Sequence, residues 1–137
     1  MAAFVLDASV AIADLSLDED PARTFGLVDR AIDEPVAIPA VWYYEVTNVF
    51  TSKLRRGVLR PEQHRDMLVN LRDLRVECDP RDLQSQCEAA CALSARHKIT
   101  VYDAAYLELA LRLKIPLATL DKALANAARD AGVAVLP

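Results

Sequence analysis

Four carboxylates occupy positions where the chain changes from one kind of segment to another. Asp7 follows a short apolar run near the start of the chain, and Asp121 follows a similar run near its end. Glu45 and Asp103 fall in the first turns of two segments with helical periodicity. Each residue alone fits an ordinary helix cap or a solvated helix position. Together they predict an acidic cluster, because parallel strands end, and the helices after them begin, at one edge of a sheet.

Such a cluster would have the chemistry of a divalent metal site. Ionised carboxylates that converge repel one another and need a compensating cation. Oxygen ligands favour Mg²⁺ or Mn²⁺, and neither His64 nor His97 has the spacing of a zinc ligand. One or two such ions can hold a phosphodiester, activate a water molecule and stabilise the leaving oxygen. We therefore expect metal-dependent nuclease chemistry.

Short apolar runs alternate along the chain with longer segments of helical periodicity, and the four acids lie within this pattern. Five apolar runs predict β-strands, at residues 3–6, 36–38, 75–78, 117–120 and 134–136. Seven periodic segments predict helices, at residues 9–15, 21–33, 41–55, 61–74, 82–96, 102–114 and 122–131. Strands that alternate with helices indicate a parallel sheet with helices on both faces. We expect Asp7 and Asp121 to share the carboxyl edge of that sheet, where α/β proteins bind ligands.

A polar line runs beside the apolar stripe of the helix predicted at residues 41–55. Glu45, Asn48 and Ser52 lie at i, i+3 and i+7, so they share one margin of the helix. Trp42 and Phe50 belong to the apolar stripe. This arrangement allows the polar line to face a cleft while the stripe packs against the core.

Length and composition exclude several other classes of protein. The chain has 137 residues, of which 53% are hydrophobic, so we expect residues 1–137 to form one globular domain. Three glycines are too few for a glycine-rich phosphate loop, a dinucleotide fingerprint or a nucleophile elbow. No run of about 18 apolar residues is present, and the N-terminus lacks the basic region of a signal peptide. We therefore expect a cytoplasmic protein without a membrane segment.

The three cysteines, Cys78, Cys87 and Cys91, are an odd number in a chain with no predicted signal peptide. This usage is typical of reduced thiols in a cytoplasm. Cys87 and Cys91 lie four residues apart on a predicted helix. We expect them to be buried as small hydrophobic side chains rather than to bind a metal ion.

Four segments of the chain resemble motifs of the PIN-domain family, and in particular of the VapC-type toxin ribonucleases. They are Val5-Leu6-Asp7-Ala8-Ser9-Val10, Glu45 with Asn48 three residues later, Tyr102-Asp103-Ala104-Ala105-Tyr106-Leu107, and Thr119-Leu120-Asp121. Their order and spacing match those of the family, and the resemblance spans nearly the whole chain. The last two segments form the most specific combination.

The resemblance implies a fold and an acidic quartet. The fold is a three-layer α/β/α domain with a five-stranded parallel sheet, in the order 3-2-1-4-5, and about seven helices. The quartet maps onto Asp7, Glu45, Asp103 and Asp121. We expect its three aspartates to bind the metal ion, and Glu45 either to bind it or to orient the attacking water. Hydroxyl and amide groups that support the carboxylates or the water map onto Ser9, Asn48 and Thr119.

The resemblance also implies an activity and partners. Proteins of this kind cleave RNA with Mg²⁺ or Mn²⁺, often as homodimers, and a cognate antitoxin wraps the toxin and can block its site. We therefore expect a metal-dependent endoribonuclease, the toxin of a VapBC-type pair. One alternative is an RNA-processing nuclease of the same family outside a toxin–antitoxin system. Another is a non-catalytic domain that binds a metal ion or a protein partner.

Two other families with an aspartate at a strand end fit less well. A haloacid-dehalogenase-like phosphatase needs a second aspartate two residues after the first, where this chain has Ser9. A phospho-receiver domain needs paired early acids, a phosphoacceptor aspartate on the central strand and a late lysine after a strand. The second and third predicted strands end instead in Ile38-Pro39 and Cys78-Asp79-Pro80.

Positive charge is concentrated in one segment of an acidic chain. The whole chain has a net charge of −4, whereas residues 53–75 hold seven basic and three acidic residues, a net +4. We expect this segment to contact RNA phosphates, unless it is a solvated helical face. The residues concerned are Lys53, Arg55, Arg56 and Arg60. Four tyrosines would either stack on bases at the mouth of the site or pack in the core or an interface: Tyr43, Tyr44, Tyr102 and Tyr106.

Overall fold

Five short parallel strands form the centre of the molecule. The computed structural model describes residues 1–16 and 24–137. The strands are β1 (Val5–Leu6), β2 (Val36–Ile38), β3 (Val76–Cys78), β4 (Leu117–Ala118) and β5 (Val135–Leu136). They lie in the order β3-β2-β1-β4-β5, and every neighbouring pair is parallel. The strand order implied by the family resemblance is therefore confirmed.

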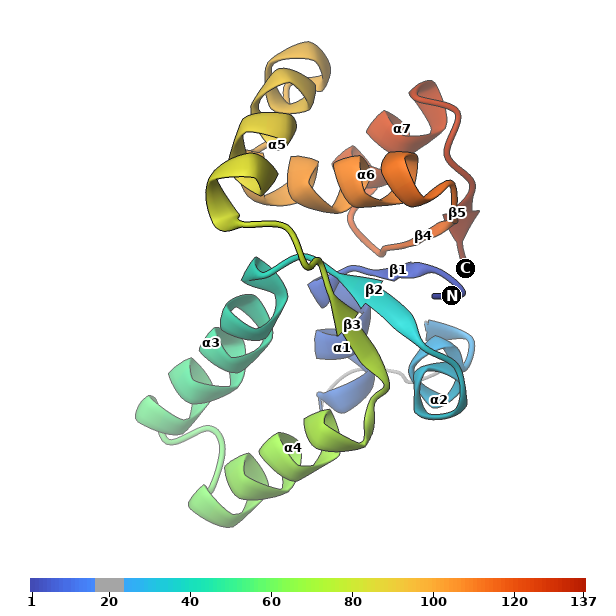
Figure 1. The fold of residues 1–137 in the computed structure, drawn as a ribbon. Coiled ribbons are helices and arrows are strands. Elements are labelled where there is room, and N and C mark those ends of the chain that lie inside the picture. Colours follow the sequence, from blue (N-terminus) through green and yellow to red (C-terminus); the bar gives the residue numbers. More distant parts are fainter. Residues whose placement is uncertain (17–23) are drawn as a thin grey trace.

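Helices cover both faces of this sheet. Those of the described residues are α1 (Ala8–Leu15), α2 (Leu27–Asp33), α3 (Val41–Arg55), α4 (Pro61–Asp73), α5 (Leu83–His97), α6 (Val101–Leu113) and α7 (Lys122–Asp130). Helices α1 to α4 lie on one side of the sheet and α5 to α7 on the other (Figure 1), which confirms the three-layer α/β/α fold. None of these helices is both long and apolar enough to cross a lipid bilayer.

The central strands are buried on both faces. Phe4, Leu6 and Ile38 are fully buried, and Trp42 of α3 and Tyr106 of α6 add the largest buried side chains of the helical layers. A parallel sheet that is covered on both sides needs apolar residues at successive positions along each strand. This double burial explains why the strands appear in the sequence as continuous apolar runs.

The strand order reverses at β1, which pairs with β2 on one side and with β4 on the other. The chain first fills the β2–β3 side and later crosses to β4. Helices α1 and α7, which follow β1 and β4, lie in opposite layers (Figure 1), so a crevice opens at this carboxyl edge. Asp7 and Asp121 hold the N-cap positions of these two helices. The topology therefore places both aspartates at the crevice, as predicted.

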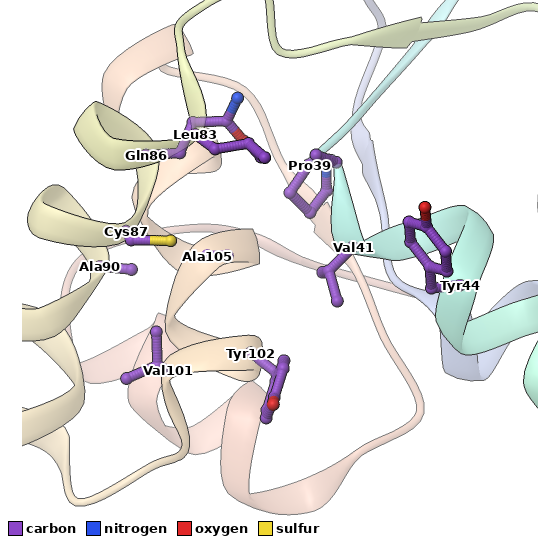
Figure 2. A pocket seen from close by; sticks show the side chains of 11 residues that line it. Pro39, Val41, Tyr44, Leu83, Gln86, Cys87, Ala90, Val101, Tyr102 and Ala105 are labelled. Atoms are coloured by element: carbon purple, nitrogen blue, oxygen red, sulfur yellow. The ribbon is translucent and has the colours of Figure 1, made fainter.

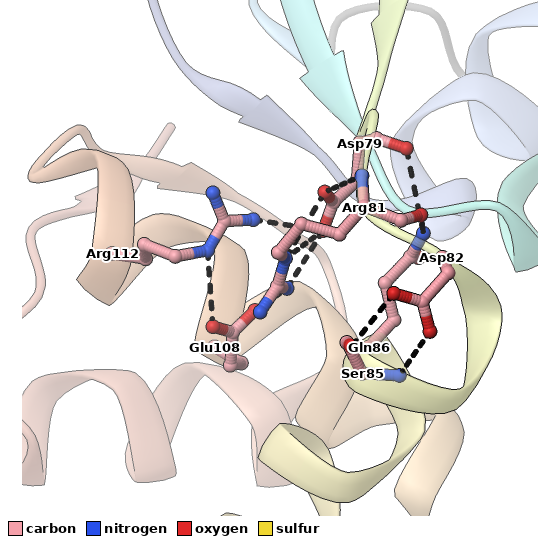
Figure 3. Close-up of polar contacts among 7 residues, drawn as sticks. All are labelled: Asp79, Arg81, Asp82, Ser85, Gln86, Glu108 and Arg112. Carbon is pink, nitrogen blue, oxygen red and sulfur yellow. Dashed lines mark hydrogen bonds and ion pairs between the residues drawn. The ribbon is translucent and has the colours of Figure 1, made fainter.

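A charge-compensated ion cluster joins α6 to the end of β3 (Figure 3). Its members are Asp79, Arg81, Glu108 and Arg112. The Asp79 carboxylate, which follows β3, lies 2.8 Å from Nη2 of each arginine. The Glu108 carboxylate on α6 contacts Arg81 at 2.6 Å and Arg112 at 3.1 Å. Because α5 and α6 pack closely together, this ion cluster holds their hairpin against the sheet.

One helix begins later than the sequence predicts. The helix expected at residues 21–33 corresponds to α2, which begins at Leu27, and residues 21–23 lie outside the described part of the chain. Gly26 has φ of 72°, in the left-handed region that glycine adopts readily and an α-helix does not continue through. The other expected helices and strands differ from the observed ones by at most two residues at either end.

The prediction that two cysteines are buried is wrong. Cys87 and Cys91 are exposed on α5, and their thiols are free, like that of Cys78. The buried positions of α5 belong to Gln86 and Ala90, each one residue before a cysteine. One residue is a rotation of about 100° around a helix, so the cysteines turn away from the packed face.

Candidate active site

Asp7 is the most buried member of the acidic quartet. Although it holds the N-cap position of α1, its side chain makes no capping hydrogen bond. Instead, its Oδ2 accepts hydrogen bonds from Ser9 Oγ at 2.5 Å and from Thr119 Oγ1 at 2.7 Å. The backbone N–H groups of Leu120 and Asp121 donate to these same two hydroxyl oxygens, each at 3.0 Å. The cap interpretation is therefore wrong for Asp7, whose carboxylate is held by side chains from β1–α1 and from the end of β4.

Asp121 caps a helix and also borders the site. Its Oδ1 accepts a hydrogen bond from the Leu124 N–H at 2.9 Å, which caps α7. After burial, the charge of Asp121 is a further cause of the raised pKa values of Asp7 and Asp103. A carboxylate has two oxygens, so capping through Oδ1 leaves Oδ2 available to a ligand.

Glu45 and Asp103 come from opposite helical layers and line one open cleft of about 560 Å³. We call it the acid cleft; its other lining residues include Asn48, Thr100 and Tyr102. Thr100 Oγ1 accepts a hydrogen bond from the Asp103 N–H at 3.1 Å and so caps α6. Two members of the polar line predicted on α3, Glu45 and Asn48, therefore face the N-terminal turn of α6 across the open cleft, whereas Ser52 does not line it.

Burial and mutual repulsion raise the pKa values of three quartet members. For Asp7, burial outweighs the hydrogen bonds from Ser9 and Thr119, and the charge of Asp121 adds to it. Burial is also the main cause of the raised pKa values of Glu45 and Asp103, and the charge of Asp7 contributes to both. These four segments, which are distant in sequence, therefore bring their charges into one electrostatic neighbourhood.

The donor set of the quartet fits a hard divalent cation. All its ligand atoms are carboxylate oxygens, which Mg²⁺ and Mn²⁺ prefer. Over residues 1–16 and 24–137, no hydrogen bond or ion pair described for a quartet carboxylate involves a lysine or arginine. Within those same ranges, no three acidic, histidine or cysteine side chains are already gathered as a metal cluster. A cation would have to draw the carboxylates closer, and it would relieve the repulsion between them.

Tyr106 contacts the quartet directly, and its burial rules out base stacking. Its side chain is fully buried, and its hydroxyl donates a hydrogen bond to Glu45 Oε1 at 2.7 Å. Burial, followed by the charges of Asp7 and Glu45, raises the pKa of Tyr106, so the phenol keeps its proton. The sequence could have indicated this role, because Tyr106 follows Asp103 by three residues and both side chains therefore lie on one face of α6.

The three remaining tyrosines differ in exposure. Tyr44 is 79% exposed and Tyr102 is 64% exposed, and both border the acid cleft. Tyr43 is 42% exposed and packs edge-on against Trp42, with ring centroids 4.9 Å apart. Tyr44 and Tyr102 are therefore the two that lie where an unpaired base next to the acids could stack.

An apolar pocket of about 280 Å³ adjoins the acid cleft. It lies between the start of α3 and the α5–α6 hairpin (Figure 2). Val41, Tyr44 and Tyr102 line both the pocket and the cleft. Leu83 and Val101, which line the pocket on its α5–α6 side, are 64% and 39% exposed. The surface beside the acids is therefore apolar rather than basic.

The basic residues expected to bind RNA lie at the far end of α3. They are Lys53, Arg55, Arg56 and Arg60. The first of them is eight residues after Glu45, which is about 12 Å along a helix axis. Arg55 Nη2 donates to Ser52 Oγ at 3.3 Å, and Arg60 lies 3.7 Å from Glu62. The structure thus brings the quartet together with Ser9, Asn48 and Thr119, and leaves the basic residues at a distance.

Comparisons with known proteins agree with this geometry. The family model for the PIN domain matches residues 4–130. Ribonuclease VapC3 from Pyrobaculum aerophilum is 34% identical over 124 residues, which span 89% of this chain and 92% of that protein.

Two crystal structures share the fold. PAE2754 from Pyrobaculum aerophilum superposes with a TM-score of 0.73 and 20% identity, over 98% of this chain and 84% of that one. FitAcB from Neisseria gonorrhoeae gives a TM-score of 0.64 and 18% identity, over 98% and 96% of the two chains. The matched sequence and the shared fold together show that this chain belongs to the PIN-domain family, among proteins of the VapC type.

Proposed function

We propose that this protein is a metal-dependent endoribonuclease and the toxin of a VapBC-type toxin–antitoxin pair. The observation that carries the proposal is the convergence of four carboxylates at the crevice of the sheet, none of them paired with a lysine or arginine among the described residues. Its relative in Pyrobaculum aerophilum, ribonuclease VapC3, supports RNA as the substrate.

Asp7, Asp103 and Asp121 would hold Mg²⁺ or Mn²⁺, with Glu45 as a fourth ligand or as the group that orients water. A bound divalent cation supplies a water molecule of lowered pKa and neutralises charge on the phosphodiester. Ser9 and Thr119 keep the Asp7 carboxylate in place, and Asn48 offers an amide across the acid cleft.

Exposed aromatic rings and the basic segment supply the contacts that we propose for the RNA itself. Tyr44 and Tyr102 flank the acid cleft, where each can stack on an unpaired base. Lys53, Arg55, Arg56 and Arg60 would contact phosphates farther along the strand. These basic residues then affect affinity for RNA more than the cleavage step.

The decisive experiment compares RNA cleavage by the wild-type protein and by Asp103→Asn in Mn²⁺, with Asp66→Asn as the control. Asp66 is exposed on α4, so its replacement removes the same charge away from the site. We expect cleavage by the wild type and by Asp66→Asn, loss of cleavage in Asp103→Asn, and loss of wild-type cleavage when the metal ion is chelated. Mn²⁺ binding without cleavage would support the non-catalytic alternative, and cleavage that survives chelation would contradict the metal site.

We also propose that two copies associate through the apolar pocket and its exposed rim. Leu83 offers a direct test, because an exposed leucine can be replaced without disturbing the core. Leu83→Glu should shift the protein from dimer to monomer in analytical ultracentrifugation. Val58→Glu is the control, since Val58 is equally exposed at the α3–α4 turn. A monomeric wild-type protein would contradict the proposal.

The toxin assignment requires a protein partner that silences the nuclease. We expect a short protein to co-purify with this chain from its native source and to inhibit RNA cleavage when it is bound. An active nuclease that never has an inhibitory partner would instead support the RNA-processing alternative.

A further inference from the structure

One buried tyrosine joins three of the segments that carry the quartet. Tyr106 lies on α6, one turn after Asp103, and its ring is fully buried. Its hydroxyl donates to Glu45 Oε1 of α3 at 2.7 Å. The backbone N–H of Ala8, the residue after Asp7, lies near the same hydroxyl.

These contacts leave the phenol little freedom. A buried hydroxyl must find partners for its hydrogen and its oxygen, and here the hydrogen is given to Glu45 while the oxygen faces Ala8. The Ala8 N–H belongs to the first turn of α1, which has no partner within the helix. The aromatic ring is fixed by close packing in the core, so the hydroxyl cannot follow Glu45 if that side chain moves.

Glu45, by contrast, is a long and half-buried side chain on an open cleft. Without an anchor, such a side chain populates several rotamers, and ordering it has an entropic cost. The hydrogen bond from Tyr106 holds one carboxylate oxygen at the buried end of the cleft. The other oxygen, Oε2, is then the one directed to ligands on the solvent side.

We propose that Tyr106 is a positioning residue that fixes the Glu45 carboxylate relative to Asp7 and Asp103 before the metal ion and RNA bind. This inference rests on the proposed function, because it concerns the same site. This role of Tyr106 is distinct from core packing and from contact with a base.

The test compares Tyr106→Phe with Tyr43→Phe. Both changes remove one hydroxyl and keep the ring, and Tyr43 packs on Trp42 outside the quartet. For Tyr106→Phe we expect kcat to fall about tenfold or more with KM within about twofold of the wild-type value, because a hydrogen bond to a charged group is absent once substrate has bound. We expect its Mn²⁺ affinity, measured by calorimetry without RNA, to fall about tenfold. Tyr43→Phe should match the wild type in all three quantities.

A double-mutant cycle separates positioning from packing. If Tyr106 acts through Glu45, then adding Tyr106→Phe to Glu45→Gln should lower the Mn²⁺ affinity and kcat much less than it does in the wild type. Thermal unfolding of each variant confirms that the fold is retained. Equal effects of Tyr106→Phe in the two backgrounds, or wild-type Mn²⁺ affinity and kcat in the single variant, would overturn the inference. A wild-type protein that cleaves no RNA would overturn the proposed function alone, since the Mn²⁺ cycle would still report on Tyr106.

Discussion

The acidic quartet and the ion cluster around Asp79 both hold buried carboxylates beside strand ends, but their charges are treated in opposite ways. Asp79 has two arginines within 2.8 Å (Figure 3), and Glu108 shares them. Asp7 has the hydroxyls of Ser9 and Thr119, a backbone contact with Ser9 and the repulsion of Asp121. The charges of the two acids and two arginines around Asp79 balance one another, whereas the four quartet acids have no basic partner in the part of the chain that the structure describes.

The pKa values express the same difference. Burial pushes the pKa of Asp79 upward, but hydrogen bonds and charge from Arg81 and Arg112 outweigh it and leave the pKa lowered. Burial also pushes the pKa of Asp7 upward, and the hydrogen bonds from its neighbours do not offset it. A buried carboxylate is therefore no sign of a functional site by itself. What distinguishes the quartet is that, within residues 1–16 and 24–137, no described contact pairs it with a lysine or arginine, so we propose that a bound cation compensates it.

The largest expected effect is the loss of RNA cleavage when a carboxylate of the acidic quartet is removed. Asp7→Asn should lower single-turnover RNA cleavage at least about 100-fold, because it removes a proposed metal ligand whose position is fixed by two hydrogen bonds. Asp79→Asn should retain cleavage at temperatures where it is folded. Full activity in a well-folded Asp7→Asn protein would remove the distinction between the two sets.

The next largest effect is a loss of stability when the ion cluster around Asp79 is disrupted. Asp79→Asn leaves Arg81 and Arg112 without their shared carboxylate, and we expect the free energy of unfolding to fall by about 2 kcal/mol. This is less than for a fully buried pair, because both arginines remain partly exposed. Glu34→Gln, which breaks the exposed pair between Arg30 and Glu34, should lower the free energy of unfolding much less in the same urea titration, because solvent screens that pair. Equal costs would show that the Asp79 cluster is not structural.

The contributions of Asp7 and Asp79 to the free energy of unfolding should also change with pH in opposite directions. The pKa of Asp7 in the folded state is raised above 3.8, so metal-free wild-type protein loses stability as pH rises from about 3.8 through that raised value. The pKa of Asp79 is lowered, so its stabilisation is present above 3.8 and is lost as pH falls through the lowered value. Urea unfolding in a chelating buffer should therefore show that the free energy of unfolding of Asp7→Asn rises relative to that of the wild type as pH increases. The deficit of Asp79→Asn should shrink in acid, and trends of the same sign would contradict this account.

The smallest effect is expected from the basic residues at the far end of α3. In an Asp103→Asn background, which we expect to bind RNA without cleaving it, replacing Arg55 and Arg56 by glutamine should weaken RNA binding a few-fold. It should reduce the slope of log affinity against log salt by about 2, one for each RNA phosphate that the protein no longer neutralises. An unchanged affinity would show that this segment is only a solvated helical face.

The locations of the strands and of the quartet could be predicted because both depend on local signals, whereas the strand order was implied only by the family resemblance. Apolar runs mark the strands, and Asp7 and Asp121 each follow one of them. The pairing around Asp79 could not be predicted, since Arg81 and Arg112 meet it only when β3 and α6 pack together.

Side-chain burial on the helices was harder to predict for a related reason. Cys87 differs from buried Gln86 by one helical step, and Tyr106 differs from exposed Tyr102 by one turn and a fraction. An error of one residue in assigning the buried face of a helix therefore exchanges buried and exposed side chains. The same error does not change the prediction that the segment is a helix. The interpretation of Asp7 as a cap failed because its hydroxyl partner Thr119 lies 112 residues away.

The two hydroxyls beside Asp7 determine where their hydrogen atoms point. The Leu120 and Asp121 amides already occupy the oxygens of Ser9 and Thr119 as donors, so each hydroxyl has a single hydrogen left to direct at the Asp7 carboxylate. Both O–H dipoles thus converge on Oδ2 with their positive ends inward. A proton on that oxygen would meet two hydrogens, so protonation of Asp7 must use Oδ1 or turn a hydroxyl away. The orientation of two small dipoles, set by the backbone that follows β4, therefore favours one carboxylate oxygen as an acceptor despite the burial that opposes its charge.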